Sequence, residues 1–120
     1  MNIVLENEVT NELRDKFMLV ELDSFQHEPD SAVIKSYAVL TKESINVQEI
    51  QNVKEYIDLH NNLMRNYRMK NWKFCEDAIE HLRGKFRGEL DSFYTVLIER
   101  VETLKDITLS ENWTPHIQQY

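Results

Sequence analysis

The sequence predicts an α+β protein, a short antiparallel sheet with one small helix (1–40) followed by a three-helix C-terminal bundle. The apolar residues form short β-type runs as far as Leu40, and they recur at helical spacing from Asn46 onward. We therefore expect a β-rich segment (1–45), a three-helix region (46–109) and a tail (110–120), with Trp113 as the anchor of that tail.

The strands are predicted by three apolar runs, at 3–5, 17–20 and 33–40. The last run is partly apolar on both faces, as expected for a strand that is covered on one side and paired into a larger sheet. Residues 26–31, which include Pro29, are typical of the turn between two strands. Between the first two runs, Val9 and Leu13 lie four residues apart, which predicts one short helix.

Three stripes of apolar residues at a spacing of about 3.6 predict the helices. The first contains Val47, Ile50, Val53, Ile57, Leu63, Met64 and Tyr67, with His60 on or beside it. The second contains Trp72, Cys75, Ile79, Leu82 and Phe86, and the third contains Leu90, Phe93, Tyr94, Leu97, Val101, Leu104 and Ile107. We expect Asn71 to cap the second helix through its side chain and Asp91 to open the third. Gly84 and Gly88 mark the boundary between them.

Composition limits the classes of function. The 120 residues carry 14 Lys and Arg against 21 Asp and Glu, a formal charge of −7, which argues against broad nucleic-acid binding. With 42% hydrophobic residues the chain can bury one modest core. The single Cys75 excludes an internal disulfide and fits a reducing compartment. The sequence shows neither an apolar run of bilayer length nor a secretory signal. We expect a cytoplasmic protein without a membrane segment.

Single residues give weak indications of chemistry. The four histidines His27, His60, His81 and His116 lack the spacing of metal ligands, so we expect no metal site and no cofactor. We expect His60 to lie at a helix surface or to be partly buried. Cys75 lies on an apolar stripe, where a core role outweighs a nucleophilic one. We therefore expect no catalytic residue.

A basic stretch between residues 65 and 87 is the clearest charge feature. Its cations are Arg65, Arg68, Lys70, Lys73, Arg83, Lys85 and Arg87. Tyr67, Trp72 and Phe86 are interleaved with them. One interpretation is a surface that binds anions or nucleic acid, with stacking on the aromatic rings. The favoured interpretation is an ordinary mixed surface, with the aromatic residues in the core. Trp72, Ala78, Phe86 and Phe93 are then expected to pack the helices, with Trp72 and Ala78 as a large and small pair of the kind found in helix-hairpin repeats.

Two segments together resemble the C-terminal end of class III adenylate/guanylate cyclases. The first is Phe-Met-Leu-Val-Glu-Leu-Asp-Ser-Phe at 17–25, followed by Tyr-Ala-Val-Leu at 37–40. In the family, a short helix is followed by a strand ending in Glu-Leu-Asp, a basic turn and a strand ending in Tyr-Ala-Leu-Leu or similar, and this segment resembles that order. The second is Asn-Tyr-Arg-Met-Lys-Asn-Trp at 66–72, with Ala78 beyond it, which resembles the helical extension that follows many bacterial catalytic domains. The resemblance covers nearly the whole chain.

The resemblance implies a cyclase segment without its chemistry. The family's metal-binding aspartates, purine-selecting residues and transition-state Asn/Arg pair lie upstream of this segment. The one catalytic feature expected inside it is a basic turn that contacts the triphosphate, and here Glu28 and Asp30 stand at the two lysine positions. Carboxylates beside a polyanion repel it. Lys35, placed in the next strand, is a poor substitute.

We therefore expect a non-catalytic protein that works by association. A three-stranded sheet leaves unpaired edges, so a second copy or a cyclase-like partner is expected to complete it. One alternative is an accessory chain that completes a nucleotide cyclase in trans. Another is a small nucleic-acid-binding protein that uses the cations at 65–87.

Overall fold

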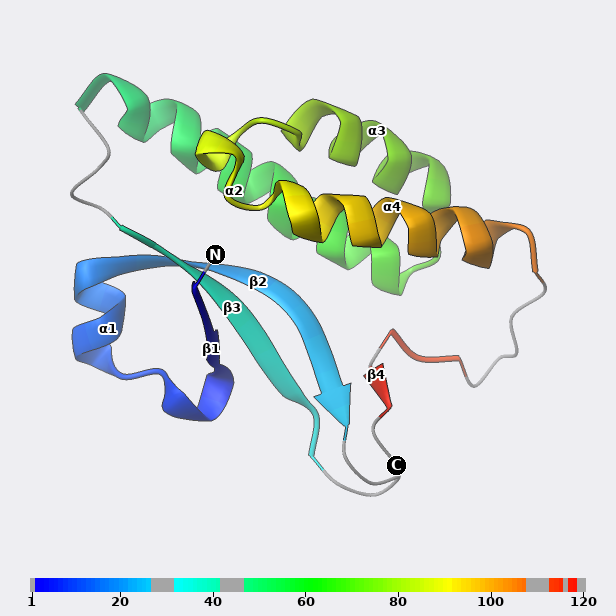
Figure 1. The fold of residues 1–120 in the computed structure, drawn as a ribbon, viewed down its shortest axis with the longest axis horizontal. Helices are drawn as coiled ribbons and strands as arrows, with labels where there is room; N and C mark the ends of the chain where they lie inside the picture. The colour runs from blue at the N-terminus through cyan, green and yellow to red at the C-terminus, as the bar shows by residue number, and fades with distance from the viewer. Residues whose placement is uncertain (1, 27–31, 42–46, 108–112, 116, 119–120) are drawn as a thin grey trace. The chain divides into compact units, whose positions relative to one another are not determined.

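The α+β class is confirmed by the computed structural model, which describes residues 2–26, 32–41, 47–107, 113–115 and 117–118 (Figure 1). The chain divides into two compact units. We call Met1–Asn52 with Pro115–Tyr120 the sheet unit, and Val53–Thr114 the helical unit. The last residues of the predicted tail thus group with the sheet.

The sheet has four strands in the order β1-β3-β2-β4. They are β1 (Asn2–Leu5), β2 (Phe17–Gln26), β3 (Ile34–Thr41) and β4 (Ile117–Gln118). β1 and β2 both pair with β3 in the antiparallel sense, and β4 runs parallel to the end of β2. The three expected antiparallel strands are confirmed, and β4 adds a short parallel fourth strand from the region expected to be only a tail.

The register places one row of small and branched side chains on the same face. Val20 lies opposite Ala38, which in turn lies opposite Ile3 of β1. Val20 and Ala38 are buried, and so are Leu22 and Leu40. The β2–β3 register shifts by one residue between Glu21 and Ser24, which is a β-bulge. At the bulge the Ser36 hydroxyl donates to the Asp23 carbonyl at 2.8 Å.

A short 3₁₀ turn, η1 (Glu6–Glu8), and helix α1 (Asn11–Lys16) connect β1 to β2. The Thr10 hydroxyl accepts the Leu13 amide at 3.1 Å and so caps α1. The predicted helix exists, but the pairing of Val9 with Leu13 on it was wrong: Val9 precedes the helix in extended conformation, since the Thr10 cap starts α1 after it.

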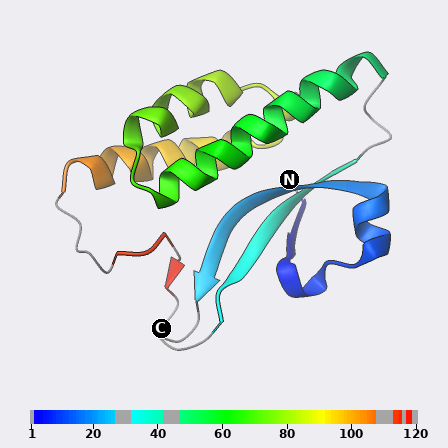
Figure 2. The ribbon, with the colours of Figure 1, turned by 180° about the vertical axis from the view of Figure 1, so that it is seen from behind.

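Three helices follow: α2 (Val47–Arg68), α3 (Trp72–Leu82) and α4 (Asp91–Lys105). Figure 2 shows them side by side from the opposite direction. All three predicted stripes contribute buried residues to the helical unit: Leu63, Met64, Tyr67, Cys75, Ile79, Leu82, Phe86, Leu90, Phe93, Tyr94, Leu97 and Val101. Ala78, which belongs to none of the stripes, is buried as well. Ile107, placed on the third stripe by its spacing, is exposed, because α4 ends at Lys105.

The α2–α3 corner is closed by the backbone rather than by a side-chain cap. Lys70 has φ +61°, its amide bonds the Tyr67 carbonyl, and the next amide, of Asn71, bonds the Asn66 carbonyl at 2.9 Å. This is the pattern of a helix C-terminus with a left-handed residue. Asn71 occupies the predicted cap position, but the predicted side-chain cap is wrong. Its side-chain amide instead donates to Asn66 Oδ1 at 2.9 Å.

Candidate functional site

The seven cations of the basic stretch fall into two groups at opposite ends of α3. Arg65, Arg68, Lys70 and Lys73 surround its beginning, and Arg83, Lys85 and Arg87 follow its end. A helix of 11 residues is about 16 Å long. The sequence places the seven residues close together along the chain, but α3 separates them in space into two smaller clusters.

The cluster at the α2–α3 corner is tied to its own surroundings. Arg65 donates to Asn62 Oδ1 at 3.1 Å, and Lys73 pairs with Asp77 at 3.1 Å. The Lys70 ammonium lies 5.7 Å from the ring centre of Trp113. Arg68 also makes interactions of its own. These cations therefore have local partners, as expected for a mixed surface.

The cluster after α3 lies on a constrained loop. Lys85 lies over the Tyr56 ring at 5.4 Å, and Arg83 donates to Thr95 Oγ1 at 3.2 Å. The loop passes through η3 (Phe86–Gly88), in which Phe86, Arg87 and Gly88 all have positive φ. Left-handed backbone costs about 1–2 kcal/mol for each non-glycine residue. Burial of the Phe86 ring offsets part of that cost.

Asp91 fixes this loop to the start of α4. Its Oδ1 accepts the Gly84 amide at 2.9 Å, and Asp91 also lies in the first turn of α4, where a carboxylate is favoured. The predicted position of Asp91 at the start of the third helix of the bundle is therefore confirmed. Its hydrogen bond closes the loop as well.

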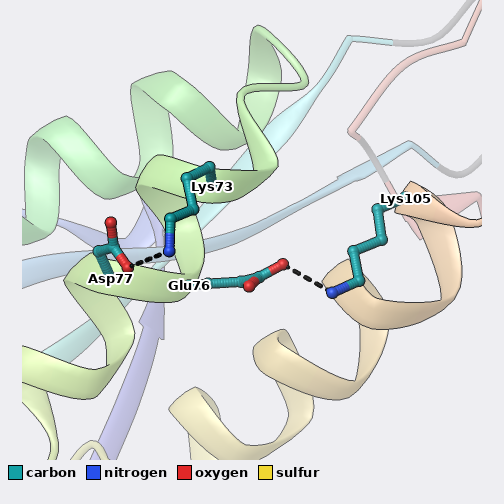
Figure 3. Close-up of polar contacts among 4 residues, drawn as sticks. All are labelled: Lys73, Glu76, Asp77 and Lys105. Atoms are coloured by element: carbon teal, nitrogen blue, oxygen red, sulfur yellow. Dashed lines mark hydrogen bonds and ion pairs between the residues drawn. The ribbon is translucent and has the colours of Figure 1, made fainter.

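One ion pair lies within α3 and a second joins α3 to α4, as Figure 3 shows. Glu76 of α3 accepts from Lys105 of α4 at 2.9 Å, and the hydrogen bond raises the pKa of Lys105. Lys73 and Asp77 pair one turn apart along α3, which likewise raises the pKa of Lys73. The Lys73–Asp77 pair is exposed and contributes little to stability, whereas Glu76 in the pair between α3 and α4 is half-buried.

One side-chain hydrogen bond of the helical unit is buried in its core. His60 of α2 is fully buried, and its Nδ1 lies 2.8 Å from the Tyr94 hydroxyl of α4. The rings of Phe86, Phe93 and Tyr94 lie within 6.5 Å of the imidazole. Burial lowers the pKa of His60 to about 4 and raises that of Tyr94. His60 is therefore neutral at pH 7. Its surface or half-buried placement, expected from the sequence, is wrong.

Cys75 lies in the core as predicted. It is fully buried, and burial raises the pKa of its thiol to about 12. A thiol held protonated at neutral pH is a poor nucleophile. The thiol faces the Leu63 carbonyl, with Sγ and oxygen 3.9 Å apart.

The four predicted packing residues have different surroundings. Ala78, Phe86 and Phe93 are buried, whereas Trp72 is only half-buried. The ring neighbours of Trp72 are Tyr67 at 5.8 Å and Trp113 at 5.9 Å, and Tyr67 and Trp113 also lie 6.0 Å apart. The three rings form one edge-to-face cluster, with Trp113 of the C-terminal segment packed at the α2–α3 corner.

The acidic turn predicted to have lost a phosphate contact lies outside the described residues, because 27–31 include both Glu28 and Asp30. The flanking strands are described. Lys35 belongs to β3, as predicted, and its ammonium lies 3.9 Å from a Glu21 carboxylate oxygen of β2. That cation is thus already beside an anion of the same sheet.

Within the described part of the chain, no group of three or more His, Cys, Asp or Glu side chains is placed to hold a metal ion. Among the described helices, none has the length and apolar character needed to cross a membrane.

Comparison with known proteins identifies no relative: no family model, no curated protein and no solved structure matches this chain. Function has to be argued from the residues and their arrangement.

Proposed function

We propose that this chain is a non-catalytic association protein of the cytoplasm, related to the C-terminal segment of class III nucleotide cyclases. One observation carries the proposal of association. β1, the end strand of the sheet, exposes 58% of Ile3 and 37% of Leu5. Large apolar side chains on an end strand favour contact with another chain.

The order of elements supports the relation to cyclases. α1 is followed directly by β2, which contains Glu21, Leu22 and Asp23, and then by β3, which contains Tyr37 to Leu40. That is the helix, strand and strand order that the resemblance implies. The second similar segment, 66–72, spans the corner between α2 and α3.

The state of the reactive side chains supports a role without catalysis. His60 and Cys75 are buried, and the pKa shifts of both hold them in their neutral forms at pH 7. Lys35 lies beside Glu21, and the turn sequence supplies Glu28 and Asp30 where a triphosphate would need cations. A nucleotide would meet carboxylates at that turn.

Two measurements on the purified chain test the proposal. Light scattering over a concentration series, together with affinity capture from the native host, should detect self-association or a specific protein partner. Incubation with ATP or GTP and a divalent metal should give no cyclic nucleotide. Turnover by the chain alone would contradict the non-catalytic assignment, and a chain that stays monomeric and retains no partner would contradict association.

A further inference from the structure

We propose that the outer edge of β1 pairs with the same edge of a second copy of this chain, in the antiparallel sense and centred on Ile3. The inference rests on the proposed function and names its partner and surface. Two hydrogen bonds fix which backbone groups of β1 face outward.

The first hydrogen bond belongs to β3. The Lys35 amide donates to Glu6 Oε2 at 3.2 Å, and Glu6 follows β1 directly. The backbone amide of Lys35 therefore faces the side of β3 on which β1 lies. Alternate residues of a strand point to the same side, so Tyr37 and Val39 also face β1. Their partners Val4 and Asn2 then use their amides and carbonyls inside the sheet.

The second hydrogen bond gives the same result from β1 itself. The Leu5 amide donates to Glu8 Oε1 at 3.0 Å. This amide is therefore not used in the β1–β3 ladder and faces away from β3. The backbone groups of Ile3, two residues earlier in the strand, face the same side as those of Leu5. The amide and carbonyl of Ile3 therefore lie on the outer edge, where no strand pairs with β1 within the described part of the chain.

The side chains favour a second copy as the occupant. The four residues of β1 carry no charge, and Ile3 and Leu5 lie on one face of the sheet because they are two residues apart. A two-fold antiparallel pairing centred on Ile3 places Ile3 against its own copy and extends this apolar face across the interface. The same patch is used on both chains, as in closed dimers.

Charge selects the antiparallel arrangement. Each copy carries Glu6 three residues from the centre, so the two Glu6 residues stand six residue steps apart, about 20 Å at 3.4 Å per step. That exceeds the Debye length of about 8 Å at physiological salt. A parallel pairing would bring them to the strand spacing of about 4.8 Å and into repulsion. Chains with a net charge of −7 can thus meet at the four uncharged residues of β1, with the Glu8 carboxylate of each copy at the Leu5 end of the edge.

The interface is small. Four residues from each chain bury less than the roughly 1,200–2,000 Å² of a stable complex. We therefore expect a reversible dimer whose population rises with concentration.

The test compares Ile3→Lys with Val96→Lys in the full chain. Both positions are exposed apolar residues, at 58% and 50%, and both changes add one positive charge. Val96 lies on α4 and belongs to the helical unit, whereas Ile3 belongs to the sheet unit. Circular dichroism should first show that both variants keep their secondary structure. Equilibrium sedimentation up to about 1 mM chain, which detects dimers bound by only about 4 kcal/mol, then measures association.

We expect the mass of the unmodified chain and of Val96→Lys to rise with concentration from 14.4 kDa toward twice that value. Ile3→Lys should raise the dissociation constant by about tenfold or more, because it places two ammonium groups at the two-fold axis. Equal association of both variants would overturn this surface and leave association itself standing. A chain that is monomeric alone yet captures another protein would overturn the second copy as partner but not the proposed function.

Discussion

The two units of this chain place their exposed apolar residues on different kinds of backbone. Those of the helical unit, Met69, Val96 and Ile107, lie on α4 or just beyond the end of a helix. The helical unit buries a histidine completely and joins it to Tyr94. The sheet unit buries small residues such as Ala38 at its centre and leaves Ile3 and Leu5 exposed on its end strand. A buried polar group is tolerated where its hydrogen bond is made, whereas exposed apolar residues on a strand edge favour a partner. We therefore expect the proposed association at the end strand of the sheet unit rather than on the helices.

The largest effect is expected from truncating the core of the helical unit. Leu97→Ala removes a fully buried side chain and should lower the free energy of unfolding by about 2–5 kcal/mol. Val96→Ala, one residue earlier and exposed, should change it by less than about 0.5 kcal/mol. Urea titration followed by circular dichroism measures both. Equal losses would contradict the assignment of the core face of α4.

Acid should destabilise the helical unit through His60. The pKa of this group is about 4 in the folded chain and 6.5 as its ordinary value, so the unfolded chain binds more protons between these values. The contribution of His60 is therefore fully present above pH 6.5 and falls as the pH drops toward 4. By then about 3 kcal/mol is lost, since each pKa unit corresponds to about 1.4 kcal/mol.

A histidine variant separates the loss of stability caused by protonation of His60 from any loss caused by protonation of carboxylates in acid. His60→Gln should remove the part of the pH dependence that lies between 6.5 and 4, whereas His81→Gln, at an exposed histidine, should retain it. Free energies of unfolding measured at several pH values make the comparison. The same slope in all three proteins would contradict a buried, neutral His60.

Removing one hydroxyl should have a somewhat smaller effect. Tyr94→Phe leaves His60 Nδ1 without its 2.8 Å partner and should cost about 1–3 kcal/mol. The double-mutant cycle with His60→Leu provides the control, because the hydroxyl then has no imidazole to bond. If Tyr94→Phe lowers the free energy of unfolding equally with His60 and with Leu at position 60, the His60–Tyr94 hydrogen bond is not a stabilising contact.

The smallest of these effects concerns the sheet unit. Thr10→Ala removes the side-chain cap of α1 and should cost about 1 kcal/mol, whereas Thr10→Ser keeps a hydroxyl and most of the stability. Hydrogen exchange of the Leu13 amide, the capped group, reports the change locally. Unchanged protection in Thr10→Ala would show that the cap contributes nothing.

Sequence periodicity predicted the elements because it reports local burial. The two main strands and the three helices follow from apolar spacing, and their ends lie close to the punctuating residues Asn71, Gly84 and Gly88. Residue spacing failed where distant segments meet. β4 has only two residues and is defined by pairing with Phe25 and Gln26, so no local pattern could indicate it.

The polar pair in the helical unit shows the same limit. His60 and Tyr94 each fall on or beside an apolar stripe, and this was the available signal for a buried pair. Their separation of 34 residues made the contact itself invisible to helical spacing. The basic stretch shows the converse limit. Its cations are close in sequence, but the length of α3 separates them in space into two clusters.

Cysteine cross-linking tests the central claim most directly. In an antiparallel pair centred on residue 3, the two Cα atoms lie about 5.5 Å apart, which suits a disulfide. Ile3→Cys should form a covalent dimer under mild oxidation at least about ten times faster than Val96→Cys, with buried Cys75 present in both. Equal rates for the two variants would contradict self-association through the edge of β1.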